Sequence, residues 1–146
     1  YNDVFIREAD GVISILGYPE SVFPPTDFHT ATLVDDALYT IGSLGYWGRR
    51  DYGKTPVHRL NLRTWRIDRL EPTGQGPGWI HGHRATRVGD HGILVTGGEV
   101  LTREGDEEQS ANNSQGFVLD TRDLVWRPPT SKSRRKRDGN RALFPL

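Results

Sequence analysis

Four residues of the sequence could ligate a metal ion, and they occur as two pairs with the same spacing. Asp27 and His29 form one pair, and His81 and His83 form the other. Side chains at positions i and i+2 of a strand lie on one face of a sheet, so each pair could offer two ligands to one ion. Nothing in the pattern fixes a third or fourth ligand. The alternative is that His29 and His83 hold turns by hydrogen bonding, and we expect no metal site and no cofactor.

A Gly-rich segment at residues 43–56 favours binding rather than catalysis. Aromatic side chains mixed with Arg, on a long loop held by a rigid scaffold, are enriched at protein interfaces. The segment combines both types. Its predicted partner-binding residues are Tyr46, Trp47, Arg49, Arg50 and Tyr52.

An acidic segment at residues 100–115 is the predicted counterpart of that loop. It is interpreted as a second long loop, with Glu107 and Asn112 as predicted partner-binding residues. Both segments link a second strand to a third, so both are expected on the same face of the molecule. The alternative is that the two loops are solvated and pair with each other.

Catalytic signatures are absent from the sequence. It has no Cys, which excludes a Cys nucleophile and a thiolate metal site within it. We find no Gly-rich phosphate loop before a helix, no nucleophile elbow and no paired His on a helix. The sequence therefore predicts no catalytic residue and no enzyme.

Two tryptophans allow either a ligand-stacking or a packing role. Trp126 is expected in the core, and Trp79 is expected to pack between two repeated units near Pro77.

The charge is unevenly distributed although the formal net charge is +0. Residues 130–146 form a basic segment of low hydrophobicity, interpreted as a disordered tail. Contact with nucleic acid or another polyanion is expected only through this tail. The absence of Cys favours a cytoplasmic location, and no run of about 18 apolar residues predicts a membrane-spanning helix. The basic residues of the tail are Lys132, Arg134, Arg135, Lys136, Arg137 and Arg141.

The elements that would position these residues occur in a repeat. "HTATLV" begins 54 residues before "HRATRV", and each is followed by a β-prone run with Gly at or next to its end. Short β-prone runs separated by turn residues predict antiparallel strands. Asp10-Gly11 between two such runs predicts a hairpin at the start of the chain. The expected strands of the two units are 28–34, 37–43, 57–62 and 65–70, then 83–88, 92–98, 116–120 and 124–128.

These stretches resemble the kelch repeat, which forms one blade of a β-propeller. Gly42 and the Gly97-Gly98 pair stand for its double glycine, and Trp126 takes its usual Trp position, where the first unit has Ile67. The resemblance implies an all-β fold made of kelch-type blades of four antiparallel strands. Residues 1–19 would be the second half of a blade, 20–70 and 71–129 two blades, and 130–146 the tail.

The resemblance also implies a function, because most kelch propellers are binding platforms. We expect a protein-interaction module that binds another protein through its inter-strand loops. Two alternatives remain: a propeller enzyme of the galactose oxidase type whose site lies mostly outside this chain, and polyanion binding through the tail. That enzyme class uses copper and a Tyr–Cys cross-link, and this chain, which has no Cys, cannot form the cross-link by itself.

Two and a half blades are fewer than the four or more of most propellers. We expect an incomplete propeller, which further chain upstream of Tyr1 or self-association of copies would complete.

Overall fold

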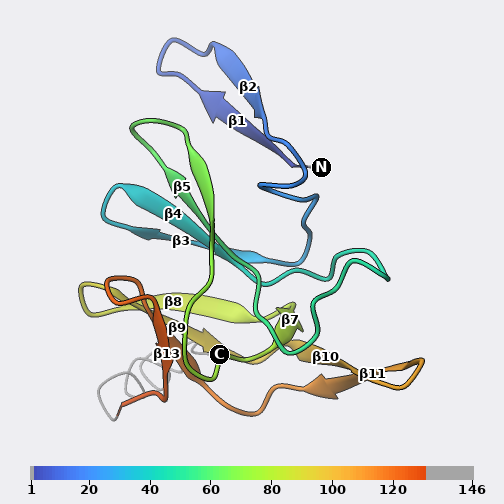
Figure 1. The fold of residues 1–146 in the computed structure, drawn as a ribbon. Coiled ribbons are helices and arrows are strands. Elements are labelled where there is room, and N and C mark those ends of the chain that lie inside the picture. Colours follow the sequence, from blue (N-terminus) through green and yellow to red (C-terminus); the bar gives the residue numbers. More distant parts are fainter. Residues whose placement is uncertain (1, 131–146) are drawn as a thin grey trace, which may run out of the picture.

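The computed structural model describes residues 2–130. Within this part of the chain it contains strands β1 to β13, arranged in four antiparallel sheets and without a helix (Figure 1). The expected all-β fold class is therefore confirmed. No segment between residues 2 and 130 forms a helix long and apolar enough to cross a membrane.

The first sheet is the expected hairpin of β1 (Asp3–Arg7) and β2 (Ile13–Gly17). Its turn forms because Gly11 adopts a φ of +90° and the Asp10 carboxylate accepts a hydrogen bond from the Val12 N–H at 3.0 Å. Alternate residues of both strands are exposed, so one face packs and the other meets solvent.

The second sheet contains four strands in chain order. One face packs against the first hairpin through Leu38, Leu60 and Ile67, and the other packs against the third sheet. The strands are β3 (Thr30–Val34), β4 (Ala37–Ile41), β5 (Val57–Asn61) and β6 (Ile67–Leu70).

The third sheet repeats the second, with the same antiparallel order. The repeat extends to single hydrogen bonds: the side-chain oxygens of Asn61 and Asp120 each accept from two backbone N–H groups that follow them. Trp65 and Leu124 close these turns with φ of +59° and +52°. The strands are β8 (Arg84–Val88), β9 (Gly92–Thr96), β12 (Phe117–Asp120) and β13 (Val125–Arg127).

A fourth sheet corrects the prediction for residues 100–115. This segment is not a loop: β10 (Glu99–Glu104) and β11 (Glu107–Asn112) form a hairpin, and β10 also pairs with β7 (Trp79–His81). The hairpin forms because Gly105 turns the chain with a φ of +60° between two extended runs. Strand β7 was not among the expected strands.

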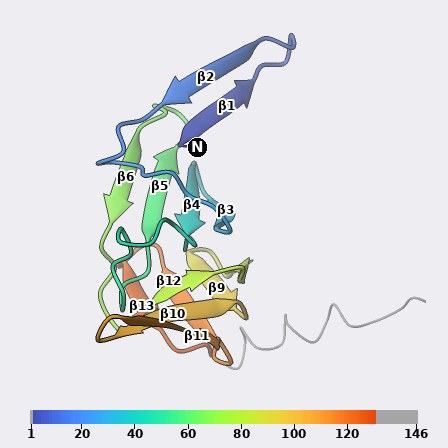
Figure 2. The ribbon, with the colours of Figure 1, turned by 90° about the vertical axis from the view of Figure 1, so that its right-hand side faces the viewer.

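The first three sheets lie one beside the next in an open stack, and the fourth sheet extends to one side (Figures 1 and 2). The main core lies between the second and third sheets, and a smaller one lies between the first and second. The main core consists of Val34, Tyr39, Ile41, Val57, Ile80, Ile93, Val95, Leu119 and Trp126.

Close approaches join the second sheet to β7 of the fourth sheet and to the residue that precedes β8 of the third. A Cβ on Gly42 would lie 2.4 Å from the Ile80 carbonyl oxygen, and His83 Nε2 lies 2.8 Å from Thr30 Oγ1. Trp126 is 6% exposed, so its expected core position is confirmed. A Cβ on Gly76 would lie 2.7 Å from the Trp126 indole nitrogen, so only Gly fits in the connector at this point.

Candidate functional site

The loop between β4 and β5, residues 43–56, is fixed to the elements around it. The Asp27 carbonyl and carboxylate accept hydrogen bonds from the N–H groups of Leu44 and Gly45, at 3.1 and 3.0 Å. The Trp79 indole N–H donates to the Leu44 carbonyl at 3.1 Å. At the other end of the loop, the Thr55 hydroxyl donates to the carbonyl of Gly78 at 2.9 Å. The loop is therefore positioned before any partner arrives, which lowers the entropy cost of binding.

Arg50 holds the loop together rather than presenting its guanidinium to solvent. It donates to the carbonyls of Leu44 and Gly45 at 2.9 and 3.1 Å and forms an ion pair with Glu108 of β11. Its side chain is 9% exposed. A charge this well buried and paired contributes to the fold and leaves little surface for a partner.

Tyr52 joins the same cluster and donates its hydroxyl hydrogen bond to Glu108 at 2.5 Å. The hydrogen bonds from Arg50 and then Tyr52 hold the pKa of the Glu108 carboxyl below its ordinary value. The same bond to Glu108 raises the pKa of the Tyr52 phenol. Residues 43–56 and the acidic hairpin thus pair with each other, the arrangement that sequence analysis carried as an alternative.

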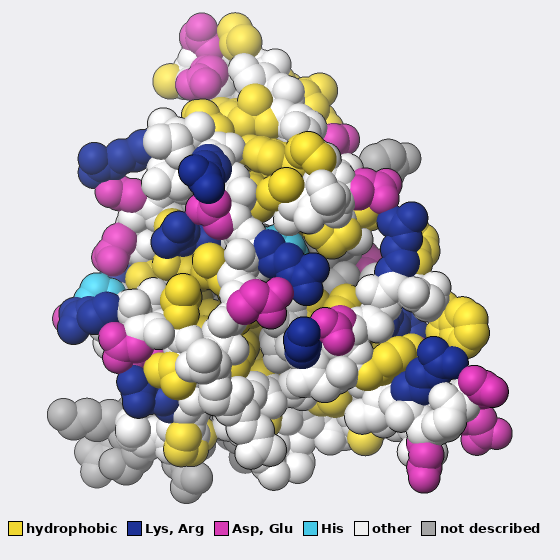
Figure 3. Space-filling model, viewed as in Figure 1, with side chains coloured by type: hydrophobic (Ala, Val, Ile, Leu, Met, Phe, Trp, Pro, Cys, Tyr) yellow, Lys and Arg dark blue, Asp and Glu magenta, His cyan; other side chains and the backbone are white. Residues whose placement is uncertain are grey.

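The tip of the loop presents two aromatic side chains to solvent. Tyr46 and Trp47 are each 66% exposed. The Arg103 guanidinium carbon of β10 lies 5.9 Å from the centroid of the Trp47 ring, and Arg49 forms an exposed ion pair with Glu20 at 2.7 Å. On the right-hand edge of Figure 3, hydrophobic and basic side chains gather over this loop, with acidic ones at the hairpin tip below.

Glu107 and Asn112 are not brought to this tip. Glu108 pairs across the hairpin with Arg103, on the face that meets the loop, and Glu107 therefore points from the opposite face. Asn112 lies at the far end of β11, where it pairs with Glu99. Both are exposed, but only the other five predicted residues lie together in or on the loop.

The two pairs of candidate metal ligands do not have the strand geometry that the sequence suggested. Phe28 and Gly82, the middle residues of the two pairs, have φ of +51° and +62°, so neither pair lies on a regular strand. His83 instead bonds Thr30 of the neighbouring sheet. Across residues 2–130, no group of three or more His, Asp or Glu side chains is placed to hold a metal ion.

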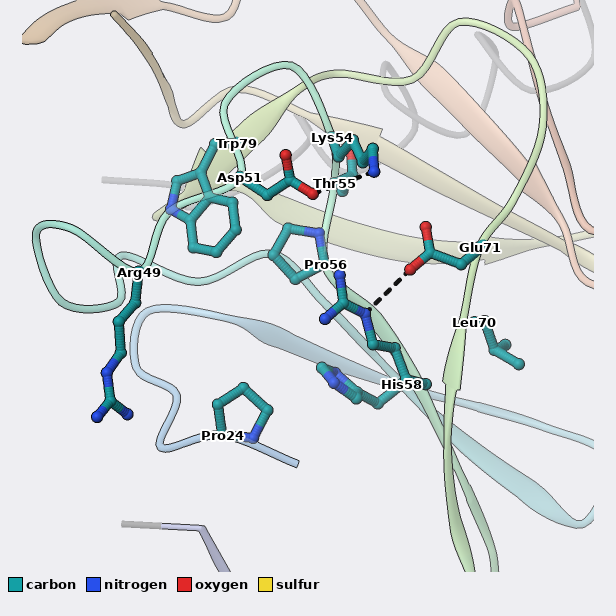
Figure 4. Close-up of a pocket in the computed structure, with 11 residues that line it drawn as sticks. Pro24, Arg49, Asp51, Lys54, Thr55, Pro56, His58, Leu70, Glu71 and Trp79 are labelled. Atoms are coloured by element: carbon teal, nitrogen blue, oxygen red, sulfur yellow. Dashed lines mark hydrogen bonds and ion pairs between the residues drawn. The ribbon is translucent and has the colours of Figure 1, made fainter. Parts of the chain in front are cut away.

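A cavity of about 180 Å³ lies beneath the loop, and sequence analysis missed it. Figure 4 shows the imidazole of His58, the rings of Pro24 and Pro56 and the Trp79 indole arranged around it. A smaller lobe of about 50 Å³ shares these four residues and is also lined by Ser43.

His58 is buried in the wall of this cavity and is 6% exposed. Its ring lies edge-on to Phe23, with centroids 5.1 Å apart. Desolvation, with the nearby Arg69 and His29 charges, lowers its pKa to about 4, so the imidazole is neutral at pH 7. In the second sheet, His58 pairs with Thr40, and at the equivalent position of the third sheet Phe117 pairs with Val95. A polar residue where the repeat has an apolar one was the signal in the sequence that could have identified His58.

The basic tail, and with it the predicted polyanion contact, lies outside the described residues. No protein-family model matches the chain, and no curated protein matches it.

Proposed function

We propose that the chain is a segment of a kelch-type β-propeller that acts as a protein-interaction module. The proposed blades are the second and third sheets, with the first hairpin as part of a preceding one. Support comes from their common strand order and from their matching Asn61 and Asp120 turns. Further support comes from the equivalent buried positions of Ile67 and Trp126.

The observation that carries the binding role is the exposure of Tyr46 and Trp47 on a fixed loop. Large aromatic side chains are costly to leave in water, and Trp and Tyr dominate the energetics of interfaces. The loop backbone is held by Asp27, Trp79 and Arg50, so a partner meets a surface that is already formed. Arg49 and Arg103 lie beside this surface, and each forms an ion pair within the chain, with Glu20 and Asp106 respectively.

The test is affinity capture from an extract of the cells that produce the protein. Trp47→Ala is compared with Leu33→Ala, which removes another exposed apolar side chain, 51% exposed, from the β3 end of the second sheet. We expect one or more proteins to be retained by the wild type and by Leu33→Ala, and to be lost with Trp47→Ala. A loss of more than about tenfold corresponds to a residue at the centre of an interface.

Equal retention by Trp47→Ala and the wild type would contradict the proposal. Circular dichroism of both variants shows whether they keep the β fold, so that a loss of capture is not a loss of structure.

A second candidate role is self-association through the outer face of the first hairpin. Phe5, Ile13 and Ile15 lie on this face and are 60–66% exposed. Phe5 and Ile15 pair directly across the hairpin, so the three side chains form one apolar stripe. In a completed propeller such a face would be covered by another blade, which a second copy could supply.

Light scattering tests this role. We expect the wild type to associate and the Phe5→Ser, Ile15→Ser double variant to be a monomer of the same β content. A monomeric wild type would exclude completion of the propeller by copies.

A further inference from the structure

Two residues in the wall of the cavity beneath the loop carry buried polar atoms without a protein partner. Ser43 Oγ and His58 Nε2 make no hydrogen bond to any residue between 2 and 130. Ser43 is 5% exposed and His58 is 6% exposed. Each such atom costs on the order of 1–3 kcal/mol, and native folds rarely keep them without a purpose. Both residues line the smaller lobe, and His58 also lines the main lobe.

The fold does not require a polar residue at position 58. The equivalent position in the third sheet is Phe117, which packs against the main core. A Phe at position 58 would therefore be compatible with the sheet. His58 introduces an unsatisfied group where the repeat accommodates an apolar ring, and this points to a ligand that satisfies it.

The size and walls of the cavity suit one ring. A cavity of about 150 Å³ is known to take benzene, and the main lobe here has about 180 Å³. Its walls include the rings of Pro24, Pro56 and Trp79, which offer flat apolar surfaces (Figure 4). Such surfaces stack against an aromatic ring.

The charges at the rim are paired with one another. Arg49 bonds Glu20, Lys54 bonds Asp51 and Arg69 bonds Glu71, at 2.7, 3.2 and 3.0 Å. No cation or carboxylate that lines the main lobe, within the described chain, is left to recognise an ion. A neutral ligand is therefore favoured over a carboxylate, a phosphate or an amine.

We propose that the cavity binds the phenol side chain of a tyrosine presented by a protein partner. A phenol hydroxyl both donates and accepts, so it can bond the neutral imidazole of His58 and the hydroxyl of Ser43 together. Phe and Pro rings would fill the space and leave both atoms unsatisfied. The assumption that a protein partner supplies the tyrosine rests on the proposed function. The two sites are adjacent, because Tyr46 of the exposed loop tip also lines the smaller lobe.

The test titrates the protein with N-acetyl-tyrosinamide and, separately, with N-acetyl-phenylalaninamide. The indole N–H resonance of Trp79 is followed by NMR. We expect saturable binding of the tyrosine compound and at least about tenfold weaker binding of the phenylalanine compound, because a site built for a hydroxyl rejects the ring that lacks it.

Two variants assign the effect to the cavity. Ser43→Ala and His58→Phe should each reduce the preference for the tyrosine compound. Ser43→Ala should not lower the free energy of unfolding, because it removes a hydroxyl that has no protein partner. Equal binding of the two compounds, or no saturable shift, would overturn the proposal.

Trp47→Ala separates this proposal from the proposed function. Trp47 does not line either lobe, so the variant should bind the tyrosine compound like the wild type. If the compound does not bind while partner capture still depends on Trp47, only the tyrosine site is wrong. If the tyrosine compound binds with the expected preference but Trp47→Ala captures partners like the wild type, the cavity binds a phenol as proposed. The loop interface, and the assumption that a protein partner supplies the tyrosine, would then be wrong.

Discussion

The two contacts between successive sheets differ in how closely they are packed. Between the second sheet and the third and fourth sheets, Gly42 meets the carbonyl of Ile80 in β7, His83 bonds Thr30, and Trp126 lies against Gly76. Between the first and second sheets, the cluster around Phe23 and Leu60 is smaller, and a cavity lined by the second sheet, its loop and Pro24 lies beside it. We call these the tight contact and the open contact.

Within one repeated architecture, the tight contact contributes to stability, and the open contact leaves room for binding. A close-packed interface leaves no room for a ligand, and its residues are fixed by shape. An interface with fewer buried apolar side chains can keep a cavity at a tolerable cost in stability. The loop at residues 43–56 covers this cavity. The interactions that fix the loop, however, mostly join it to Gly78, Trp79 and Glu108, which lie in or next to β7 and β11 on the side of the tight contact.

The largest expected effect comes from emptying the equivalent core positions of the two contacts. Trp126→Ala should lower the free energy of unfolding by about 3–5 kcal/mol, because a buried indole against Gly76 leaves a cavity that cannot collapse. Ile67→Ala should lower the free energy of unfolding by about 2 kcal/mol, since the first hairpin can move closer and partly fill the space left by the side chain. Urea unfolding measures both values. Equal costs would remove the distinction between the two contacts.

The next effect is a loss of stability in acid, which involves one histidine from each contact. Desolvation, with nearby charges, lowers the pKa of His58 and of His83 from the ordinary 6.5 to about 4. The unfolded chain therefore binds protons first, and stability that is full above pH 6.5 falls as the pH drops towards 4. Each histidine contributes on the order of 3 kcal/mol to this loss.

Urea unfolding across that pH range checks the acid prediction, with His58→Phe as the variant. This variant should lose about half of the pH dependence, because His83 of the tight contact still titrates. An unchanged slope would mean that His58 is not buried as a neutral ring.

A smaller effect is expected from adding one methyl group to the tight contact. Gly42→Ala places a Cβ 2.4 Å from the Ile80 carbonyl oxygen at a φ of +77°. Gly53→Ala is the matched control, since Gly53 has a φ of +87° but no atom within 4 Å of an added Cβ. Both variants carry the strain of a positive φ, so their difference of about 2 kcal/mol in urea unfolding reports the close approach alone. Equal free energies of unfolding for the two variants would mean that the Ile80 carbonyl moves away from the added methyl group at no cost.

The sequence predicts the repeated sheets because their turns are local. Asp10-Gly11 and the Asp35-Asp36 pair stand between alternating apolar runs, and each forms the expected hairpin. Strand β7 could not be found in this way, because its three residues become a strand only by pairing with β10. The Gly105-Asp106 turn of the hairpin was present in the sequence, but the acidic residues around it favoured a loop.

The candidate site was predictable in composition and not in geometry. Tyr46 and Trp47 are exposed as an interaction loop requires. Arg49 and Arg50 are neighbours of the same type, and only the folded chain decides that Arg50 turns inward to Glu108. His58 is visible as unusual only once the strand pairing aligns it with Phe117.

The smallest expected effect tests whether the loop depends on the fourth sheet. Glu108→Gln removes the charge that pairs with Arg50 and weakens its bond with Tyr52. We expect a loss of about 1 kcal/mol in urea unfolding, and faster tryptic cleavage after Arg49 and Arg50, because the loop detaches from β11 more often. Glu107→Gln is the matched control, since it removes the same charge from the opposite face of the hairpin. If both variants are cleaved at the wild-type rate, the hydrogen bonds of Asp27, Trp79 and Thr55 hold the loop over the cavity without the Glu108 ion pair. The open contact would then keep its cavity without help from the fourth sheet.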